Sequence, residues 1–223
     1  MRVIVFDVNE TLLDLAPMSA HFERHFGDAK VAKTWFGQLL QNALVATVTE
    51  TYRDFVDLAR DALEMVAEVQ NVHLNSVDKD NILGTMRHLP PHDDVRESLE
   101  RLKAAGFRLA TLTNSPYRSL TDQLTNAGLI DLLEQTLSVD EVKLFKPHRA
   151  AYVMAAEKLG VSLSDIRIVA AHNWDTTGAI RAGCKAAFLA RPGHVLGEAD
   201  ERPDIIADTM DGIVDQIIQQ DKE

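Results

Sequence analysis

The stretch of sequence that decides the fold is Val3-Ile4-Val5-Phe6-Asp7-Val8-Asn9-Glu10-Thr11-Leu12-Leu13-Asp14. Its first four residues are apolar and mostly β-branched, which predicts a short buried strand of a parallel sheet. The strand ends on the carboxylate of Asp7, and a small hydroxyl residue, Thr11, follows four positions later. Ligands of α/β proteins are met at the carboxyl ends of strands. Asp7 is therefore a candidate nucleophile or metal ligand.

Length, charge and cysteine content narrow the class of protein. The chain has 223 residues, of which 46% are hydrophobic, enough for one large domain or a domain with an insert. A formal charge of −11 argues against non-specific binding to nucleic acid or to anionic membranes. The single cysteine, Cys184, permits no disulfide within the chain, and no apolar run is long enough to span a bilayer. We expect a cytoplasmic protein that acts on a small molecule.

The pattern of apolar residues changes twice along the chain. Residues 15–87 contain apolar residues at the spacing of amphipathic helices, as in Phe55-Val56-x-Leu58-Ala59-x-x-Ala62-Leu63. The stiff segment Leu89-Pro90-Pro91-His92 follows. Beyond it, strand-like and helix-like segments alternate, several of the helices ending at glycine. This pattern predicts an α/β fold, a doubly wound parallel sheet with a helical cap inserted after the first strand. The expected boundaries are 1–14 and 88–223 for the core and 15–87 for the cap.

Polar residues cluster at the ends of four predicted strands. The clusters are Asp7 to Thr11, Thr113-Asn114-Ser115, Lys146-Pro147 and His172-Asn173-Trp174-Asp175. Parallel strands end at the same edge of a sheet, so the four clusters are expected to meet in one crevice.

The order and spacing of these clusters resemble the haloacid dehalogenase superfamily over nearly the whole chain. Within it, the chain is similar to the type II (S)-2-haloacid dehalogenases. The similar segments are Phe6-Asp7-x-x-x-Thr11-Leu12-x-Asp14, Leu112-Thr113-Asn114, Lys146-Pro147-x-x-x-x-Tyr152 and Asn173-Trp174-Asp175-x-x-Gly178-Ala179. The resemblance implies hydrolysis of short 2-haloalkanoic acids to 2-hydroxy acids, with an ester formed on the first aspartate, and it implies a homodimer formed through the cap.

Three positions favour this chemistry over phosphoryl transfer. The Mg²⁺-dependent phosphatases of the superfamily carry an acid/base aspartate two positions after the nucleophile, where this chain has Asn9. An amide cannot exchange a proton at neutral pH. The additional acidic residue that they place near the metal is replaced by Ala170 or Ala171, and Mg²⁺ requires several oxygen ligands. We expect no metal and no other cofactor.

Candidate roles follow for the core residues. Lys146 is the expected counter-ion that keeps Asp7 ionised, and Asp175 is the candidate to orient or deprotonate the hydrolytic water. Hydrogen bonds to the substrate carboxylate or to Asp7 are expected from Thr11, Thr113, Asn114 and the backbone N–H groups of residues 8–10. Tyr152 resembles the family tyrosine that supports the lysine region.

The cap is expected to close over the crevice and exclude water. Trp35, Leu40 and Phe55 are candidates to wall an apolar pocket from the cap side, and Asn173 and Trp174 from the core side. The alternative is that these aromatic side chains simply pack the cap onto the core.

Two residues depart from the pattern of the resembled family. Phe36 follows the cap tryptophan where the family typically has an arginine that helps to receive the halide, and Arg53 or Arg60 are candidate substitutes. His172 stands where the family usually has an asparagine near the leaving group. It is either a hydrogen-bond donor to the departing halide, fluoride above all, or a structural histidine. The remaining histidines considered are expected at the surface or in loops: His88, His92, His148 and His194.

Two other functions remain open from the sequence. One is a Mg²⁺-dependent small-molecule phosphatase of the same superfamily. The other is a binding protein that kept the fold and lost catalytic turnover. The presence of Phe36 in place of the family's arginine favours this second alternative.

Overall fold

β1 (Val3–Phe6) is a central strand of the sheet in the computed structural model, which describes residues 2–221. Within these residues the sheet has six strands, all parallel, in the order β3-β2-β1-β4-β5-β6. The others are β2 (Arg108–Thr113), β3 (Gln135–Ser138), β4 (Ile166–Ala170), β5 (Lys185–Leu189) and β6 (Ile205–Ala207). This arrangement confirms the predicted doubly wound α/β fold.

The position of β1 explains its apolar sequence. All four of its residues are buried because β2 pairs along one edge and β4 along the other, with Val3 opposite Arg108 and Ile166. The chain winds outward from β1 in both directions, so the strand order reverses between β1 and β4. Such a switch point opens a crevice at the carboxyl ends of the two strands. Asp7 follows one of these strands and His172 follows the other.

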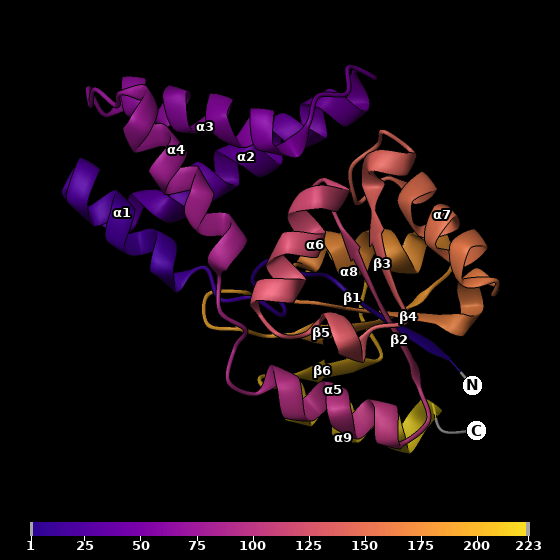
Figure 1. Cartoon of the computed structure of the whole chain (residues 1–223). Helices are drawn as coiled ribbons and strands as arrows, with labels where there is room; N and C mark the ends of the chain where they lie inside the picture. The colour runs from indigo at the N-terminus through magenta and orange to yellow at the C-terminus, as the bar shows by residue number, and fades with distance from the viewer. Residues whose placement is uncertain (1, 222–223) are drawn as a thin grey trace.

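Helices cover the sheet and are drawn in Figure 1. They are α5 (Val95–Ala104), α6 (Tyr117–Asn126), α7 (Arg149–Leu159), α8 (Asn173–Ala182) and α9 (Met210–Asp221). α5 and α9 pack against each other beneath β5 and β6 in that view, whereas α7 and α8 pack together on the other side of the strands. Gly160 and Gly183 adopt left-handed backbone angles directly after α7 and α8, as the glycine stops in the sequence predict.

Residues 16–88, which we call the helical layer, contain helices only. They form α1 (Ala16–Phe26), α2 (Val31–Val48), α3 (Phe55–Val69), α4 (Ser76–Gly84) and the short 3-10 helix η1 (Thr85–His88). Figure 1 shows this layer on one side of the molecule, away from both termini. α2 packs against α1 and α3, and α3 buries the apolar face formed by Leu58, Ala62 and Val66. The helical spacing of apolar residues in the sequence is thus explained by the packing of helix against helix.

The chain enters and leaves the helical layer through two adjacent segments. Leu13 and Pro91 form an isolated antiparallel bridge. Asp14 donates its backbone N–H to the Pro90 carbonyl at 2.9 Å, and His92 donates to the Leu12 carbonyl at 3.0 Å. The segment before α1 and the segment after η1 are therefore tied together.

The ends of some helices differ from the sequence-based expectation. The pattern predicts a helix from Thr176, but α8 begins at Asn173, so Asp175 lies in its first turn rather than in a loop. A carboxylate there is favoured by the positive end of the helix dipole. Among residues 2–221, no helix combines the length and the apolar character that crossing a membrane requires.

Candidate active site

β1 brings the Asp7 carboxylate to the edge of the sheet. The backbone N–H of Asp7 continues the β ladder by donating to the Val169 carbonyl at 3.0 Å. After Asp7 the chain turns sharply, because Leu12 and Leu13 both donate to the Val8 carbonyl. The side chain of Asp7 is only 5% exposed.

Three side chains hold the Asp7 carboxylate. The ammonium of Lys146 donates to Oδ1 at 2.9 Å, and the hydroxyl of Thr11 donates to Oδ2 at 2.8 Å. His172 Nδ1 also lies 3.0 Å from Oδ2. Thr11 Oγ1 in turn accepts the backbone N–H of Ala171 at 2.9 Å, so it ties the loop after β1 to the loop after β4. The structure brings together these three predicted site residues around Asp7.

The Lys146 ammonium lies between two carboxylates. Besides Asp7 it donates to Asp175 Oδ2 at 2.6 Å and to the Leu112 carbonyl at 2.7 Å. Its backbone N–H donates to Asn114 Oδ1 at 2.9 Å, so Asn114 holds the lysine in place. Lys146 is 3% exposed and Asp175 is fully buried. Excellent geometry of this kind is what a buried ion pair needs to offset the loss of hydration.

Tyr152 supports the other side of Asp175. Its hydroxyl donates to Asp175 Oδ1 at 2.7 Å and lies in the protein interior. The absence of a side chain at Gly178 leaves room for this contact between Tyr152 and Asp175. A methyl group at position 178 would lie 2.4 Å from Pro147 Cβ and 2.8 Å from the tyrosine oxygen. Tyr152 was expected to support the lysine region, and the structure places it on Asp175, which contacts Lys146.

The pKa directions follow from these contacts. Burial alone raises the pKa of Asp7, but the charge of Lys146 and the hydrogen bond from His172 outweigh it and hold the pKa well below its usual range. Burial lowers the pKa of Lys146, and the charges of Asp175 and Asp7 raise it above its usual value. Burial raises the pKa of Asp175, with the nearby Asp7 charge adding to it against Lys146. Asp7 is thus a carboxylate kept ionised in a dry site.

His172 lies between two carboxylates and two aromatic rings. Its Nε2 is 2.9 Å from Glu10 Oε2, while Nδ1 faces Asp7. Its ring stacks on Trp174 with centroids 4.8 Å apart and on Phe36 at 6.1 Å. Burial lowers the pKa of His172, but its hydrogen bonds to Asp7 and Glu10 outweigh this effect and raise the pKa to about 9. At neutral pH His172 is an imidazolium between two π faces, a favourable place for a cation.

Asn9, two positions after Asp7, is committed to other contacts. Its Nδ2 donates to the Ser115 hydroxyl at 3.3 Å, and its Oδ1 accepts from Gln123 Nε2 at 3.0 Å. Thr113 is likewise engaged locally, because its hydroxyl oxygen accepts the backbone N–H of Ser115 at 3.2 Å. Both residues shape the crevice beside Asp7 rather than point into a cavity.

A cavity of about 830 Å³ adjoins His172 between the helical layer and the sheet edge. The predicted site residues that line it are Trp35, Phe36, Leu40, His172, Asn173 and Trp174. Asn173 also donates to Asp200 Oδ2 at 2.9 Å. Trp35 is fully buried and its indole N–H donates to the Ala59 carbonyl at 2.9 Å, so it fixes α2 to α3 as well.

Some expectations about this cavity were wrong. Phe55 packs against Phe145 with ring centroids 5.7 Å apart and lines a separate cavity of about 280 Å³. Neither arginine offered as a replacement cation lines the larger cavity: Arg53 pairs with Asp61 on the surface, and Arg60 pairs with Asp80 at 2.6 Å. Phe55 and Arg60 lie on α3 and Arg53 lies just before it, and each is engaged by a neighbour outside the larger cavity.

Two further histidines line the larger cavity. His92 and His194, which were expected at the surface or in loops, lie in loops and are half-buried there. The ring of His92 contacts the Glu10 carbonyl at 3.2 Å, and His194 Nε2 lies 3.4 Å from Glu10 Oε1. The segment Arg191-Pro192-Gly193-His194 begins two residues after the end of β5. It is a fifth strand-end cluster, and its position in the sequence was the signal that could have identified it.

Comparisons with known proteins agree on one family. The profile of the haloacid dehalogenase-like hydrolases matches residues 1–183. The chain is 28% identical over 217 residues to an (S)-2-haloacid dehalogenase of Pseudomonas sp. strain YL, covering 96% of this chain and 94% of that one. It is 30% identical over 181 residues to (S)-2-haloacid dehalogenase 1 of Pseudomonas sp. strain CBS-3, covering 80% of each. The crystal structure of an L-2-haloacid dehalogenase superimposes with a TM-score of 0.94 at 27% identity, over 98% of this chain and 99% of that one.

Proposed function

Since this chain belongs to the haloacid dehalogenase-like hydrolases, we propose that it is a hydrolase of carbon–halide bonds that converts short 2-haloalkanoic acids into 2-hydroxy acids. The names of its relatives support this substrate class. The observation that carries the proposal is the Asp7 carboxylate, which is buried, ionised and held by three donors at the sheet edge. An anchored carboxylate of this kind is suited to attack at carbon.

The first step is a displacement at C2 of the substrate. A lone pair of an Asp7 carboxylate oxygen forms the new C–O bond as the carbon–halogen bond breaks, and the halide leaves with the electron pair of the broken carbon–halogen bond. The product of this step is an ester between Asp7 and the 2-position of the acid. Lys146 and Thr11 contribute by keeping the carboxylate charged and oriented before attack.

The second step is hydrolysis of that ester. Water attacks Cγ of Asp7 and gives one proton to Asp175. The bond between Cγ and the oxygen that Asp7 had supplied then breaks, the leaving alkoxide takes that proton from Asp175 to become the 2-hydroxy acid, and Asp7 loses the second proton of the water to solvent and returns to a carboxylate. The raised pKa of Asp175 supports its role as proton acceptor, since its burial favours the protonated form. Tyr152 and Lys146 orient it from opposite sides.

We assign His172 to the nucleophile rather than to the halide. Its Nδ1 contacts the attacking group itself, and a halide displaced from carbon departs on the side opposite the attacking oxygen. Its other ring nitrogen faces Glu10. Replacement of His172 by Asn is expected to lower chloride and fluoride release alike. A selective loss of fluoride release would restore His172 as the halide donor.

The substrate is proposed to lie against the apolar wall of the larger cavity. Phe36, Leu40 and Trp174 supply that wall. A cradle for the substrate carboxylate is expected from Asn114 and from the backbone N–H groups of Val8 and Asn9. Glu10 does not contribute to this cradle, because its N–H already donates to the Leu13 carbonyl at 2.9 Å.

The residues at the sheet edge do not fit a Mg²⁺ site. Asp7 and Asp175 each offer an oxygen, but the Lys146 ammonium lies between those oxygens, 2.9 Å from one and 2.6 Å from the other. Ala170 and Ala171 supply no carboxylate, and Asn9 is bonded to Ser115 and Gln123. Mg²⁺ binds poorly where so few oxygen ligands are free. We therefore propose a reaction that needs no divalent metal.

Residues 15–87 are proposed to act as a cap over this site. Phe36 reaches from α2 to stack on His172, and the Thr47 hydroxyl accepts the backbone N–H of Phe145 at 3.1 Å. Tyr52 donates a hydrogen bond to Asp140 at the same border. These contacts support a cap that shields Asp7 from bulk water during the first step.

We also propose a homodimer that forms through the helical layer. Most of the exposed large apolar side chains lie there, on α2, α3 and α4: Leu44, Val45, Val48, Val56, Met65, Val69 and Val77. Tyr117 on α6 is the one on the described helices of the sheet. Val48 is 81% exposed and Val69 is 78% exposed. An apolar surface of this kind is typical of an interface with a second chain.

Halide release tests the proposed function. The panel contains fluoroacetate, chloroacetate and both enantiomers of 2-chloropropionate, with a chelator present and Asp7→Asn as the inactive control. We expect the wild type to release halide and Asp7→Asn to release none. Of the two 2-chloropropionate enantiomers, only the (S) form should react, and the chelator should not change the rate. Under single-turnover conditions in water enriched in oxygen-18, the label should enter Asp7 and be absent from the 2-hydroxy acid.

Other outcomes would favour the alternative functions. Release of phosphate from an aryl phosphate that requires added Mg²⁺ would indicate a phosphatase. No halide from any acid in the panel, with the folded protein, would indicate a binding protein.

A further inference from the structure

Glu10 is a conspicuous residue that the proposed reaction does not use. Its backbone is left-handed, with φ of 62°, a conformation that costs a glutamate energy and that persists where surrounding contacts enforce it. Those contacts are the hydrogen bond from its N–H to the Leu13 carbonyl and the contact of its carbonyl with His92. The strained backbone aims the carboxylate of Glu10 at two histidines.

The side chains of Glu10, His172 and His194 converge on one point of the larger cavity. His172 Nε2 lies 2.9 Å from Glu10 Oε2, and His194 Nε2 lies 3.4 Å from Glu10 Oε1. One nitrogen from each histidine and one oxygen from the glutamate all lie within 4.8 Å of one another. Ligand atoms around a tetrahedral Zn²⁺ with bonds of about 2.0–2.1 Å are about 3.3 Å apart, close to these separations.

The hydrogen bonding of His172 prepares its Nε2 for a metal. A carboxylate only accepts hydrogen bonds, so Nδ1, which faces Asp7, carries its proton. The nitrogen left to coordinate is Nε2, the one that points to Glu10. A histidine whose second nitrogen donates to a carboxylate is the usual arrangement at zinc sites, where that contact fixes the orientation of the ring.

His194 is held by a rigid turn. The segment Arg191–His194 has Pro192 and Gly193 at its centre, Gly193 has a φ of 91°, and His194 donates its N–H to the Arg191 carbonyl at 2.9 Å. These are the features of a type II turn. The Arg191 guanidinium donates to both carboxylate oxygens of Asp94 at 2.8 Å. This ion pair anchors the turn to the core, and the carboxylate of Asp94 balances the positive charge of Arg191.

We propose that Glu10, His172 and His194 form a binding site for a divalent transition-metal ion, with Zn²⁺ the best match. Two imidazoles and one carboxylate are the ligand set of several zinc sites that keep a fourth position open. All three residues line the cavity of about 830 Å³, so an ion and a fourth ligand can reach them. The site is separate from Lys146 and Asp175.

Binding at this site inhibits turnover. On coordination, the metal ion takes the place of the proton on His172 Nε2, which passes to solvent. The ion lies at the cavity wall against which the substrate is proposed to bind. The protein is therefore a dehalogenase that needs no metal but is reversibly inhibited by zinc.

Direct metal binding tests the proposal without relying on activity. Metal-stripped protein is titrated with Zn²⁺ by calorimetry in mildly alkaline buffer, because the histidines must be deprotonated to coordinate. Co²⁺ is used in parallel, since its visible absorption bands report tetrahedral coordination. We expect one ion per chain and intense Co²⁺ bands in the wild type, and affinity more than about tenfold weaker in Glu10→Gln and in His194→Asn.

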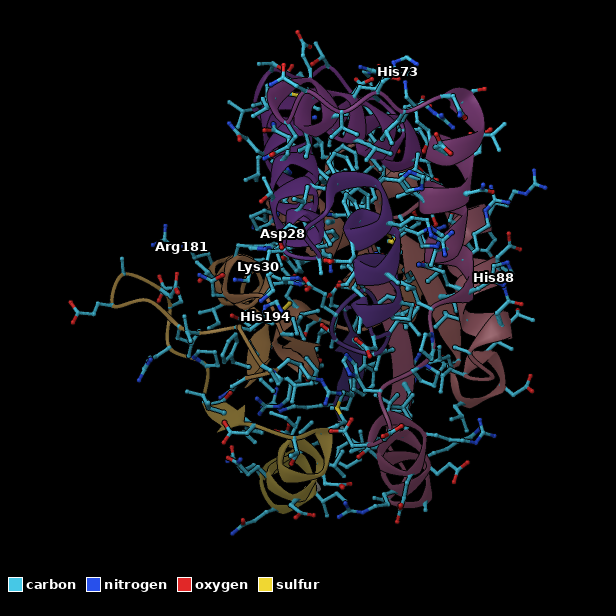
Figure 2. The ribbon with its side chains drawn as sticks, turned by 90° about the vertical axis from the view of Figure 1, so that its left-hand side faces the viewer. Asp28, Lys30, His73, His88, Arg181 and His194 are labelled. Atoms are coloured by element: carbon cyan, nitrogen blue, oxygen red, sulfur yellow. The ribbon has the colours of Figure 1, made fainter. Side chains whose placement is uncertain are left out.

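His73→Asn and His88→Asn are matched controls. Figure 2 shows His73 at the far end of the helical layer and His88 on the opposite side of the molecule from His194, so neither should change Zn²⁺ affinity. Circular dichroism confirms that each variant is folded. Wild-type protein that takes up no ion, or binding that survives both Glu10→Gln and His194→Asn, would overturn the proposal. Halide release without added metal tests the dehalogenase function separately, so the two proposals fail independently.

Discussion

His172 donates a hydrogen bond from Nδ1 to the Asp7 carboxylate at 3.0 Å, so the candidate nucleophile contacts a second cation besides Lys146. The pKa of His172 is raised from 6.5 to about 9, chiefly because its hydrogen bonds to Asp7 and Glu10 outweigh its burial. A raised pKa in the folded state means that protonated His172 stabilises the fold. That stabilisation is complete below about pH 6.5 and is lost as the pH rises through about 9.

The first prediction follows from this linkage. Between these two pH values the free energy of unfolding of the wild type should fall by roughly 2–3 kcal/mol more than that of His172→Asn. Urea denaturation across the pH range measures both, with His73→Asn, an exposed histidine, as the control that should follow the wild type. Parallel curves for the wild type and His172→Asn would contradict a charged His172.

Lys146→Met is expected to be severely damaging. It removes the cation between Asp7 and Asp175 and leaves two buried carboxylates facing each other. Loss of one partner of a buried ion pair costs about 3–5 kcal/mol of stability, and the pKa of a remaining carboxylate should rise until it binds a proton. Chemical denaturation and halide release measure the two effects. Lys158→Met, at an exposed lysine paired with Glu141, should change the free energy of unfolding by no more than about 0.5 kcal/mol and should leave halide release unchanged.

Asp175→Asn separates the two chemical steps. If Asp175 accepts the proton of the hydrolytic water, this variant should still form the ester but not hydrolyse it. The expected result is a burst of about one halide per chain without further turnover, with the substrate fragment attached to Asp7 in the mass spectrum. A variant that releases no halide in the burst would assign Asp175 to the activation of Asp7 through Lys146 instead.

Gly178→Ala should disturb the site through its supports. The added methyl group would lie 2.4 Å from Pro147 Cβ and 2.8 Å from the Tyr152 hydroxyl, which holds Asp175. Overpacking of this kind costs about 1–3 kcal/mol, and kcat should fall with it. The control is Gly84→Ala, where the backbone is helical and the new methyl group meets nothing within 4 Å beyond its chain neighbours and the backbone of its own helix. That change should be neutral or slightly stabilising in thermal denaturation.

The proposed dimer is tested on its apolar surface. Val48→Glu combined with Val69→Glu places two charges on the exposed face of the helical layer. Sedimentation velocity should show the wild type as a dimer and the double variant as a monomer that is still folded. Val195→Glu, at an equally exposed valine outside the layer, should remain dimeric. A dimer in both variants would place the interface elsewhere.

The sequence predicts much of the core because its signals are local. The β-branched run of β1, the glycine stops after α7 and α8, and the polar residues after each strand all act within a few residues of where they stand. Asp7, Lys146 and Asp175 could be placed together because parallel strands end at one edge.

Side chains whose place depends on packing between helices were harder to predict. Phe55 belongs to an apolar helical face, but only the docking of α3 shows that it packs on Phe145 and not at the larger cavity. Tyr152 was associated with the lysine region, and its contact with Asp175 depends on the small size of Gly178. His194 was missed because a lone histidine in a turn carries no sign of the glutamate that faces it from the other half of the sheet.

The bridge between Leu13 and Pro91 has a consequence for how the chain can vary. Because the two connecting segments pair with each other, Leu13 and Pro91 stay side by side at the border of the sheet whatever helices lie between them. Insertions, deletions or exchange of the intervening helices therefore leave the register of β1 and the start of α5 undisturbed. The proposed cap can be replaced as a cassette while Asp7, Lys146 and Asp175 stay in place. If the proposed roles hold, substrate range in this architecture can change without any change in the chemistry.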